Sequence, residues 1–393
     1  MSEESRAVNS SPERLPWNVK LLGMTSLLND IATEMAFPVI PLLLAILAPG
    51  EKWIVGLVEG VADTVAAMLK LFSGNWSDRL DNRRGFVLVG YGLAAVARPF
   101  IGVASAAWQV VVVRTLDRVG KGLRASPRDA LIAESTAESQ RGRAFGFHQA
   151  MDHLGAAIGP LLSFLFLWQF PGHLGELFFL TAIPGIAIMG LLFWGLEKPS
   201  RKTRAGKTLR LTLQPFSPRF KRFLGCILLF TLGNSSDMVL LQRAGELQIS
   251  MPLLWCAFNI AKSIGNLLCG PLVDRRGAFK TLLVGWALYG FAYAGFAAAQ
   301  TAWLFCAVVG VYALHFSLSE PAEKTLAVQL AGPERKGLAL GWFNFTVGIF
   351  ILPANLLTGW LYQVYGPQAA FATCALFALA ATAALATLRP AEE

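Results

Sequence analysis

The sequence of 393 residues has little charge, since only 15% of its residues are Asp, Glu, Lys or Arg. Soluble domains contain about 25%. Hydrophobic residues make up 54% of the chain, and its mean hydropathy is +0.51. These values exclude a soluble enzyme, and the 11% aromatic content excludes a disordered chain, which could not bury so much apolar surface. The sequence therefore predicts an integral membrane protein.

Cysteine is also scarce, and none of the five cysteines forms a close pair with another. This excludes a disulfide framework and a CxxC-type zinc site. Gly120-Lys121-Gly122 lacks the spacing and the Ser/Thr of a nucleotide-binding loop, and GxSxG and HExxH are missing. His148, Asp152 and His153 have no accompanying carboxylate cluster that would make a metal site. We therefore expect no enzymatic activity, no nucleotide, no metal and no other cofactor.

Long stretches without charge define the fold class. Residues 337–388 contain no Asp, Glu, Lys, Arg or His, and His315 is the only such residue within 281–319. A membrane-spanning helix needs about 20 apolar residues, so each stretch holds two spans. In lipid only a helix satisfies such a backbone. An all-α membrane protein with twelve helices is expected, at 17–47, 53–73, 85–105, 108–134, 142–169, 174–196, 223–246, 252–273, 279–299, 302–328, 337–363 and 368–388.

The basic residues predict the orientation of these helices. Most of the 34 lysines and arginines fall toward one side of the membrane, with Lys121, Arg124 and Arg128 counted in the region where the fourth helix leads into the fifth. By the positive-inside rule, both termini and the long middle loop are cytoplasmic, here in a bacterial inner membrane. The stretch 1–16 has no apolar core and is not expected to be a cleaved signal peptide. The net charge of +9 is thus interpreted as a topology signal, and no nucleic-acid partner is expected.

An internal repeat divides the chain in two. Gly74-Asn-Trp-Ser-Asp78-Arg79 returns half a chain length later as Gly270-Pro-Leu-Val-Asp274-Arg275. The predicted organisation is a tail (1–16), a six-helix bundle (17–197), a basic linker (198–222), a second six-helix bundle (223–388) and a tail (389–393). Transporters are built from such repeats, with the substrate site between the halves.

These motifs resemble those of the major facilitator superfamily over nearly the whole chain. Gly270 to Lys280 reads G-P-L-V-D-R-R-G-A-F-K, and the first copy has Asp81 where the family has its second glycine. Arg114 and Arg118 resemble the family's fourth-helix motif, and Gly155-x-x-x-Gly159-Pro160 resembles the signature of its exporters. The resemblance, which extends to bacterial efflux permeases, implies two pseudo-symmetric six-helix bundles that work by alternating access.

The repeated motif is expected to form a cytoplasmic gate. Its aspartates can meet a neighbouring helix N-terminus, and its arginines can bind facing carboxylates or carbonyls. The alternative is a plain topology anchor, which we expect for Arg83, Arg84 and Lys280. The predicted gate residues are Gly74, Asp78, Arg79, Gly270, Asp274, Arg275 and Gly277.

Ionisable residues at membrane depth are costly unless they are paired or face a cavity, so each is a candidate for function. Proton coupling needs a carboxylate whose pKa changes with exposure and with nearby cations. We expect Asp30 or Glu34 to lie close to Arg114 and to form this pair, as the resemblance also implies; a static salt-bridge network is the alternative. The predicted cavity residues are Asp30, Glu34, Glu59, Asp63, Arg114, Asp117, Arg118, His148, Asp152, Asp237 and Lys262.

The function favoured by these features is proton-coupled antiport that exports a small organic molecule, driven by the proton gradient. Import of an anionic metabolite, an organic acid or a phosphate ester, is the alternative, because Arg98, Arg114 and Lys262 make a cationic interior. A membrane enzyme or a sensor would be a third class. The expected partners are the substrate and the lipid bilayer, and the chain is expected to be a monomer.

Overall fold

The computed structural model describes residues 15–137, 140–197, 213–214, 216–332 and 336–388. The predicted tails and most of the predicted linker lie outside these ranges. The side chains of 142, 267, 270–274, 336 and 337 are likewise not described. In the described ranges the chain contains helices and turns, with no strand.

The first half of the chain forms six passes from one face of the molecule to the other. Short 3-10 segments continue two of these passes, and a turn divides the last. The elements are α1 (Trp17–Ala36), η1 (Phe37–Val39), α2 (Ile40–Leu47), α3 (Ile54–Arg79), α4 (Arg83–Ala97), η2 (Arg98–Val103), α5 (Ala107–Glu134), α6 (Arg141–Gln169), α7 (Leu174–Leu180) and α8 (Ala182–Gly195).

The second half repeats this arrangement with α9 (Pro218–Gly233), α10 (Asp237–Glu246), α11 (Met251–Arg276), α12 (Ala278–Ala298), α13 (Ala302–Ala331) and α14 (Lys336–Ala386). α14 holds two passes, because Gly366 has a φ of 85° and turns the chain. α9 begins at Pro218 rather than at 223, since the Ser217 side chain accepts a hydrogen bond from the Phe220 amide and proline fits the first helical position.

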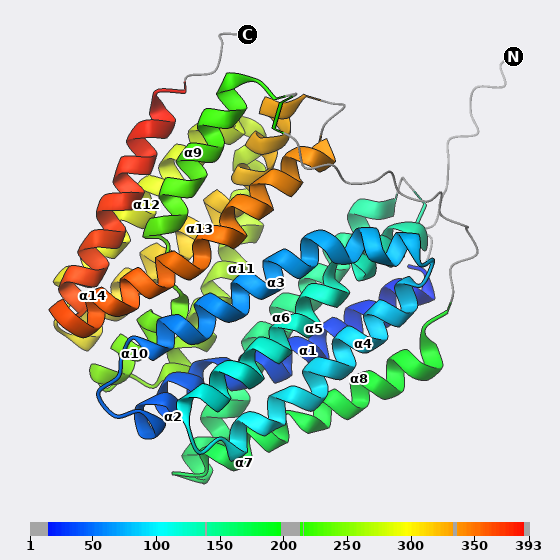
Figure 1. Ribbon diagram of the computed structural model, residues 1–393, viewed down its shortest axis with the longest axis horizontal. Helices are drawn as coiled ribbons and strands as arrows, with labels where there is room; N and C mark the ends of the chain where they lie inside the picture. The colour runs from blue at the N-terminus through cyan, green and yellow to red at the C-terminus, as the bar shows by residue number, and fades with distance from the viewer. Residues whose placement is uncertain (1–14, 138–139, 198–212, 215, 333–335, 389–393) are drawn as a thin grey trace, which may run out of the picture.

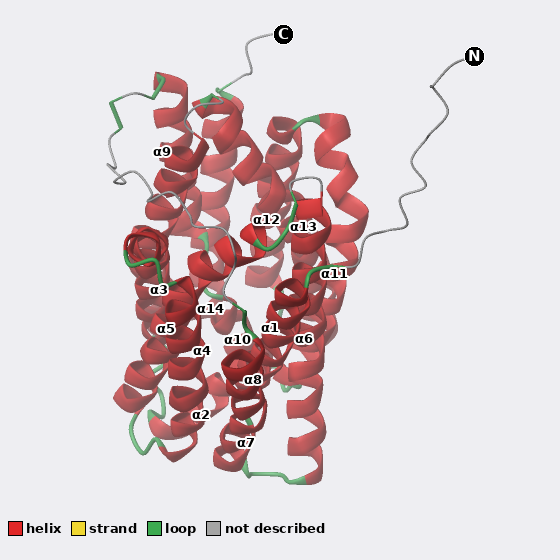
Figure 2. Cartoon of the chain, turned by 90° about the vertical axis from the view of Figure 1, so that its right-hand side faces the viewer, coloured by secondary structure: helices red, strands yellow, loops and turns green. Residues whose placement is uncertain are grey.

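The two halves lie side by side, with α1–α8 in one bundle and α9–α14 in the other (Figure 1). They meet where α3 packs on α14 and where α6 packs on α11. We call the face where α1 begins and α3 and α14 end the terminal face, and the face where α2 and α10 end the far face. Figure 2 shows the helices running between these two faces.

Length, composition and tryptophan positions all fit a membrane protein. Among the described residues, eight helical segments are long and apolar enough to cross a membrane, and Leu338–Ala386 is one of them. Exposed tryptophans form two belts, as at membrane–water interfaces. Trp17, Trp76 and Trp194 lie near the terminal face, and Trp108, Trp168, Trp303 and Trp360 lie near the far face.

The repeated motif has a residue with positive φ at the equivalent position in both halves. Gly277, just before α12, has a φ of 80°, and Asp81, just before α4, has a φ of 46°. Aspartate tolerates this left-handed conformation better than most residues. The glycine that the first copy lacks is therefore replaced by a residue that keeps the turn.

Candidate functional site

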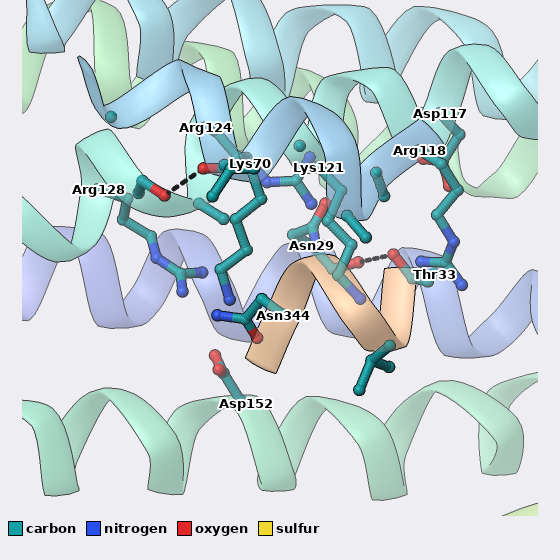
Figure 3. A pocket seen from close by; sticks show the side chains of 18 of the residues that line it. Asn29, Thr33, Lys70, Asp117, Arg118, Lys121, Arg124, Arg128, Asp152 and Asn344 are labelled. Carbon is teal, nitrogen blue, oxygen red and sulfur yellow. Dashed lines mark hydrogen bonds between the residues drawn. The ribbon is translucent and has the colours of Figure 1, made fainter. Parts of the chain in front are cut away.

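A cavity of about 730 Å³ lies between the first half and α14. Its walls come from α1, α3, α5, α6 and α14, and it extends from Asp30, within α1, to Asp78 near the terminal end of α3 (Figure 3). A second cavity of about 370 Å³ shares Glu34, Arg118 and Lys121 with the first and reaches α10, α11 and α13 of the other half. Pockets for small molecules measure about 300–1,000 Å³.

Nine of the eleven predicted cavity residues line these two spaces. They are Asp30, Glu34, Glu59, Asp63, Asp117, Arg118, Asp152, Asp237 and Lys262. Arg114 is fully buried and His148 nearly so, and neither is among the residues that line them.

Buried ion pairs join α3, α5 and η2 behind the cavity. Arg114 Nε donates to Glu59 Oε1 at 2.7 Å, and its Nη1 lies 3.1 Å from Asp117 Oδ2. Arg98 Nη2 lies 2.7 Å from the other Asp117 oxygen. Each carboxylate is held by a guanidinium, which offsets the cost of burying these charges.

Arg118 extends this network toward the cavity. Its Nη2 lies 3.5 Å from Glu59 Oε2 and its Nε lies 3.2 Å from Asp63 Oδ1. Three guanidinium groups thus face three carboxylates, and we call this set the buried network: Arg98, Arg114, Arg118, Glu59, Asp63 and Asp117.

The expected pairing of Arg114 with Asp30 or Glu34 is wrong, because Glu59 and Asp117 hold the Arg114 guanidinium. Glu34 instead accepts a hydrogen bond from Trp255 Nε1 of α11, at 2.6 Å. Glu34 therefore connects the two halves of the protein. Arg98, which completes the buried network, had been noted only as an interior cation.

Two glycines of the predicted fifth-helix motif set the position of α1. A Cβ atom added to Gly155 would lie 2.6 Å from the Leu27 carbonyl oxygen and 2.9 Å from Asp30 Cβ. One added to Gly159 would lie 2.6 Å from the Ile31 carbonyl oxygen. Pro160 follows within α6, and Ser163 Oγ donates to the Met35 carbonyl. The motif thus holds α6 against the part of α1 that carries Asp30.

Several charged groups at the larger cavity have no ion pair among the described residues. Lys70 of α3 and Lys121 of α5 lie more than 4 Å from every described carboxylate oxygen, and both side chains are exposed in the cavity wall. Asp30 accepts a hydrogen bond from Asn29 at 3.0 Å, and Asp152 lies 3.5 Å from His148 Nδ1. Lys121 lies within α5, which ends at Glu134 as the expected helix 108–134 does.

Arg124 and Arg128 also lie within α5, inside the expected helix 108–134. The Arg124 guanidinium stacks on the Tyr91 ring at 4.4 Å, and Arg128 Nη2 donates to Asp129 Oδ1 at 2.9 Å. Both line the larger cavity.

The second half contributes Asp237 and Lys262 to the smaller cavity. Asp237 Oδ1 accepts a hydrogen bond from Tyr312 at 2.6 Å. Lys262 Nζ lies 3.9 Å from Glu320 Oε2 and 4.4 Å from the centre of the Phe316 ring. His315 hydrogen-bonds the Gly285 carbonyl and Ser319, so it serves packing within this half.

The predicted gate residues make contacts within the first half. Asp78 Oδ1 accepts two hydrogen bonds from Arg83, the first residue of α4, at 2.7 and 2.9 Å, and Arg83 also pairs with Glu134. Arg84 donates to the Phe193 carbonyl at 2.9 Å. Arg83 and Arg84 are therefore not plain anchors. Arg79, Arg275 and Gly277 are exposed, and the side chains at Gly270 and Asp274 lie outside the described part.

The halves make a polar contact at the far face that the sequence had not indicated. Lys52 Nζ lies 2.6 Å from Glu246 Oε1, and the Lys52 amide donates to Gln363 Oε1 at 2.6 Å. Tyr362 and Arg243 also donate to Glu246, at 2.8 and 3.0 Å. We call Lys52, Glu246, Tyr362 and Gln363 the far-face latch. Its only signal in the sequence was that Lys52 is the one basic residue in a loop on that side.

The described residues contain no group of three or more His, Cys, Asp or Glu side chains placed to hold a metal ion. The side chains that line the two cavities offer ion pairs, hydrogen bonds and proton exchange.

Comparison with known proteins agrees with this architecture. The family model described as Major Facilitator Superfamily matches residues 22–254 and 239–393. An uncharacterised transporter of Methanocaldococcus jannaschii is 30% identical over 372 residues, covering 92% of each chain. A multidrug resistance protein, MdtH of Baumannia cicadellinicola, is 22% identical, covering 87% of this chain and 84% of its own. A variant of the nucleoside transporter NupG superposes with a TM-score of 0.79 at 12% identity, and the match covers 94% of this chain and 99% of the NupG chain.

Proposed function

The chain belongs to the major facilitator superfamily and is a multi-pass membrane transporter, and from this premise we propose that it exports a small organic molecule in exchange for protons. The observation that carries the proposal is a set of carboxylates at the cavity without a permanent cation. Asp30, Glu34 and Asp152 line the larger cavity, and among the described residues none lies within 4 Å of a lysine or arginine nitrogen. In the buried network, by contrast, the carboxylates are paired with arginine guanidinium groups.

Exchange follows from competition at these carboxylates. A carboxylate at a water-filled cavity that has no fixed cation can take up either a proton or a cationic group of the substrate. Proton uptake then expels the substrate, and substrate binding expels the proton. The charged and titratable groups that face these carboxylates are Lys70, Arg118, Lys121, Arg128 and His148.

Alternating access fits the contacts between the halves. In the structure the larger cavity reaches the terminal face, whereas the latch and the packing of Gly56 and Gly60 against Asn355 and Leu352 hold the halves together at the far face. We assign the terminal face to the cytoplasm of a bacterial cell, so this conformation would face inward. The opposite state requires the latch to break and the terminal ends to approach.

Export as the direction of transport is supported by the α6 glycine motif and by the name of the MdtH relatives. The cavity is built by one chain, so we propose a monomer that uses the proton gradient and no cofactor or nucleotide. Import of an anionic metabolite is the second candidate, because Lys70 and Lys121 face the same cavity and have no ion pair with any described residue. Uptake of a labelled organic acid by whole cells, lost in the Lys121→Gln variant, would favour import.

The proposed function is tested with inverted membrane vesicles that contain the full chain. We expect a pH gradient, acid inside, to drive accumulation of particular compounds from a defined mixture of polar metabolites measured by mass spectrometry. Asp30→Asn should reduce that accumulation about tenfold or more, because the exchange site loses its charge. Glu176→Gln, at an exposed acid in α7, is the matched control. Accumulation that survives collapse of the gradient would contradict proton coupling.

The far-face latch leads to a separate prediction. Lys52→Glu places a second carboxylate beside Glu246, so the far face should open more often. The reporter is Ser236→Cys, introduced into the same protein and labelled by a membrane-impermeant thiol reagent added at that face. Its labelling should accelerate about fivefold. An exposed ion pair contributes about 1 kcal/mol, which limits the effect to this size. The exchanged pair Lys52→Glu/Glu246→Lys should restore part of the slow rate, because it rebuilds the ion pair between the halves but places a lysine beside Arg243. Equal labelling rates in all three proteins would show that the latch does not hold this face closed.

A further inference from the structure

We propose that the transported molecule is a zwitterion, with its anionic group bound by Lys70 and Lys121 and its cationic group bound by Asp30 and Asp152. This inference rests on the proposed function, because it takes the larger cavity as the transport site. It adds the charge pattern of the substrate, which neither the family match nor the relatives specify.

The basic side of the site is formed by α3 and α5. Ser126 Oγ donates to the Lys70 carbonyl at 2.9 Å and so ties the two helices together. Figure 3 shows the side chains of Lys70, Lys121, Arg118 and Arg128 extending from these helices into the cavity. Arg118 and Arg128 are occupied by Asp63 and Asp129. Lys70 and Lys121 are the two described cations of this wall that have neither an ion pair nor an aromatic ring as a partner.

Lys121 lies deep in the membrane region, about 20 Å from the terminal end of α5 at 1.5 Å per residue. A lysine at such depth is costly unless it faces water or a ligand, and a fixed counter-ion would have removed that cost. The described part of the chain supplies none within 4 Å. The two ammonium groups are therefore available to an anionic ligand.

The acidic side of the site is formed by α1 and α6. Gly155 brings these helices together, with Asp30 Cβ only 2.9 Å from the place that a side chain at Gly155 would take. Asp152 lies one turn before Gly155 in α6 and points toward the wall that bears Lys70 and Arg128 (Figure 3). Asp152 Oδ1 and His148 Nε2 are buried without a hydrogen-bond partner among the described residues.

The cations come from α3 and α5 and the carboxylates from α1 and α6. No ion pair within 4 Å joins Lys70 or Lys121 to Asp30 or Asp152, although Arg128 Nη1 reaches Ser26 Oγ of α1 at 3.4 Å. A molecule with one charge would neutralise one wall and leave the other without a partner. A molecule with both charges neutralises both walls and carries no net charge through the membrane. Ala66, Leu71, Leu340 and Val347 line the space beside the charged groups and suit an apolar body between the two ends.

Three probes that share one ring measure this preference directly. 4-(Aminomethyl)benzoate carries both charges, 4-methylbenzoate carries only the negative charge, and 4-methylbenzylamine carries only the positive charge. Binding to the purified full chain in nanodiscs is followed by calorimetry at constant ionic strength. We expect the zwitterion to bind at least about tenfold more tightly than either singly charged probe, since each added ion pair at a partly buried site contributes about 1.4 kcal/mol.

Charge-removing variants identify the two walls. Lys70→Gln/Lys121→Gln should reduce the affinity for the zwitterion to that for 4-methylbenzylamine. Asp30→Asn/Asp152→Asn should reduce it to that for 4-methylbenzoate. Lys20→Gln and Glu176→Gln, at exposed positions outside the cavity lining, should leave all three affinities unchanged. Lys70→Arg/Lys121→Arg keeps the charge and should retain most of the preference, which separates loss of charge from loss of fold.

Equal affinities for the three probes, or a zwitterion affinity unchanged in the Lys70→Gln/Lys121→Gln variant, would overturn the inference. This outcome differs from failure of the proposed function, because binding in nanodiscs requires no gradient. A protein that shows the expected preference but does not exchange protons in vesicles would retain the zwitterion site and lose the antiport proposal.

Discussion

Arg114→Ala should lower the stability of the folded protein more than any other single change in the buried network. The substitution leaves Glu59 and Asp117 each without a guanidinium that now lies within 3.1 Å. Breaking a buried ion pair on one side costs about 3–5 kcal/mol, because the remaining charge is buried without compensation. We expect loss of the monodisperse peak in size-exclusion chromatography and a large fall in the thermal midpoint.

The network offers a matched rescue for this variant. In Arg114→Leu/Glu59→Gln the unpaired charge of Glu59 is removed, while Arg98 remains with Asp117 and Arg118 remains with Asp63. This double variant should regain most of the lost thermal stability although it has two substitutions. A single Arg114→Ala protein that unfolds at the wild-type temperature would show that these ion pairs do not support the fold.

Gly159→Ala should abolish transport although it adds only one methyl group. Its Cβ would lie 2.6 Å from the Ile31 carbonyl oxygen and 2.8 Å from the Met35 amide nitrogen, and these are backbone atoms that cannot rotate away. α1 must therefore move, and with it Asp30 and Glu34. A misplacement of about 1 Å in such a site can reduce rates about 100-fold, and overpacking costs about 1–3 kcal/mol.

Gly146→Ala is the control for this prediction, because Gly146 lies in the same helix with nothing within 4 Å of its added Cβ. There alanine should be neutral or slightly stabilising, since it favours helix by about 1 kcal/mol over glycine. Accumulation in vesicles and the thermal midpoint are measured for both variants. Equal activity of Gly159→Ala and Gly146→Ala would show that the close contact of α6 with α1 is not required.

The fold class could be predicted from the sequence because lipid imposes strong constraints. Stretches without charge specify membrane helices, the repeated Gly-x-x-x-Asp-Arg motif specifies a turn, and the glycines at 155 and 159 specify a close helix contact. The family match and the architecture confirm the fold. The helix bounds that differ most are the end of α3, at Arg79 instead of 73, and the start of α9, at Pro218 instead of 223, because both are charged segments that a hydropathy profile excludes.

The pairing of the charges could not be predicted. A sequence shows that Arg114, Asp30 and Glu59 lie at membrane depth, but which carboxylate meets the guanidinium depends on how α3 and α5 pack. The latch was missed for the same reason, since Lys52 and Glu246 come from opposite halves. Asp30, Glu34 and Asp152 were already candidates from the sequence, and what the structure added is that Arg114 is engaged by Glu59 and Asp117 instead.

The most direct test of the central claim is the luminal pH of inverted vesicles during transport. The vesicles contain the full chain and a trapped pH-sensitive dye, and they receive the compound that accumulates from the metabolite mixture. The account predicts that entry of this compound raises the luminal pH, because protons leave in exchange, and that Asp30→Asn abolishes the change. Accumulation of the compound with no change of luminal pH would contradict proton exchange.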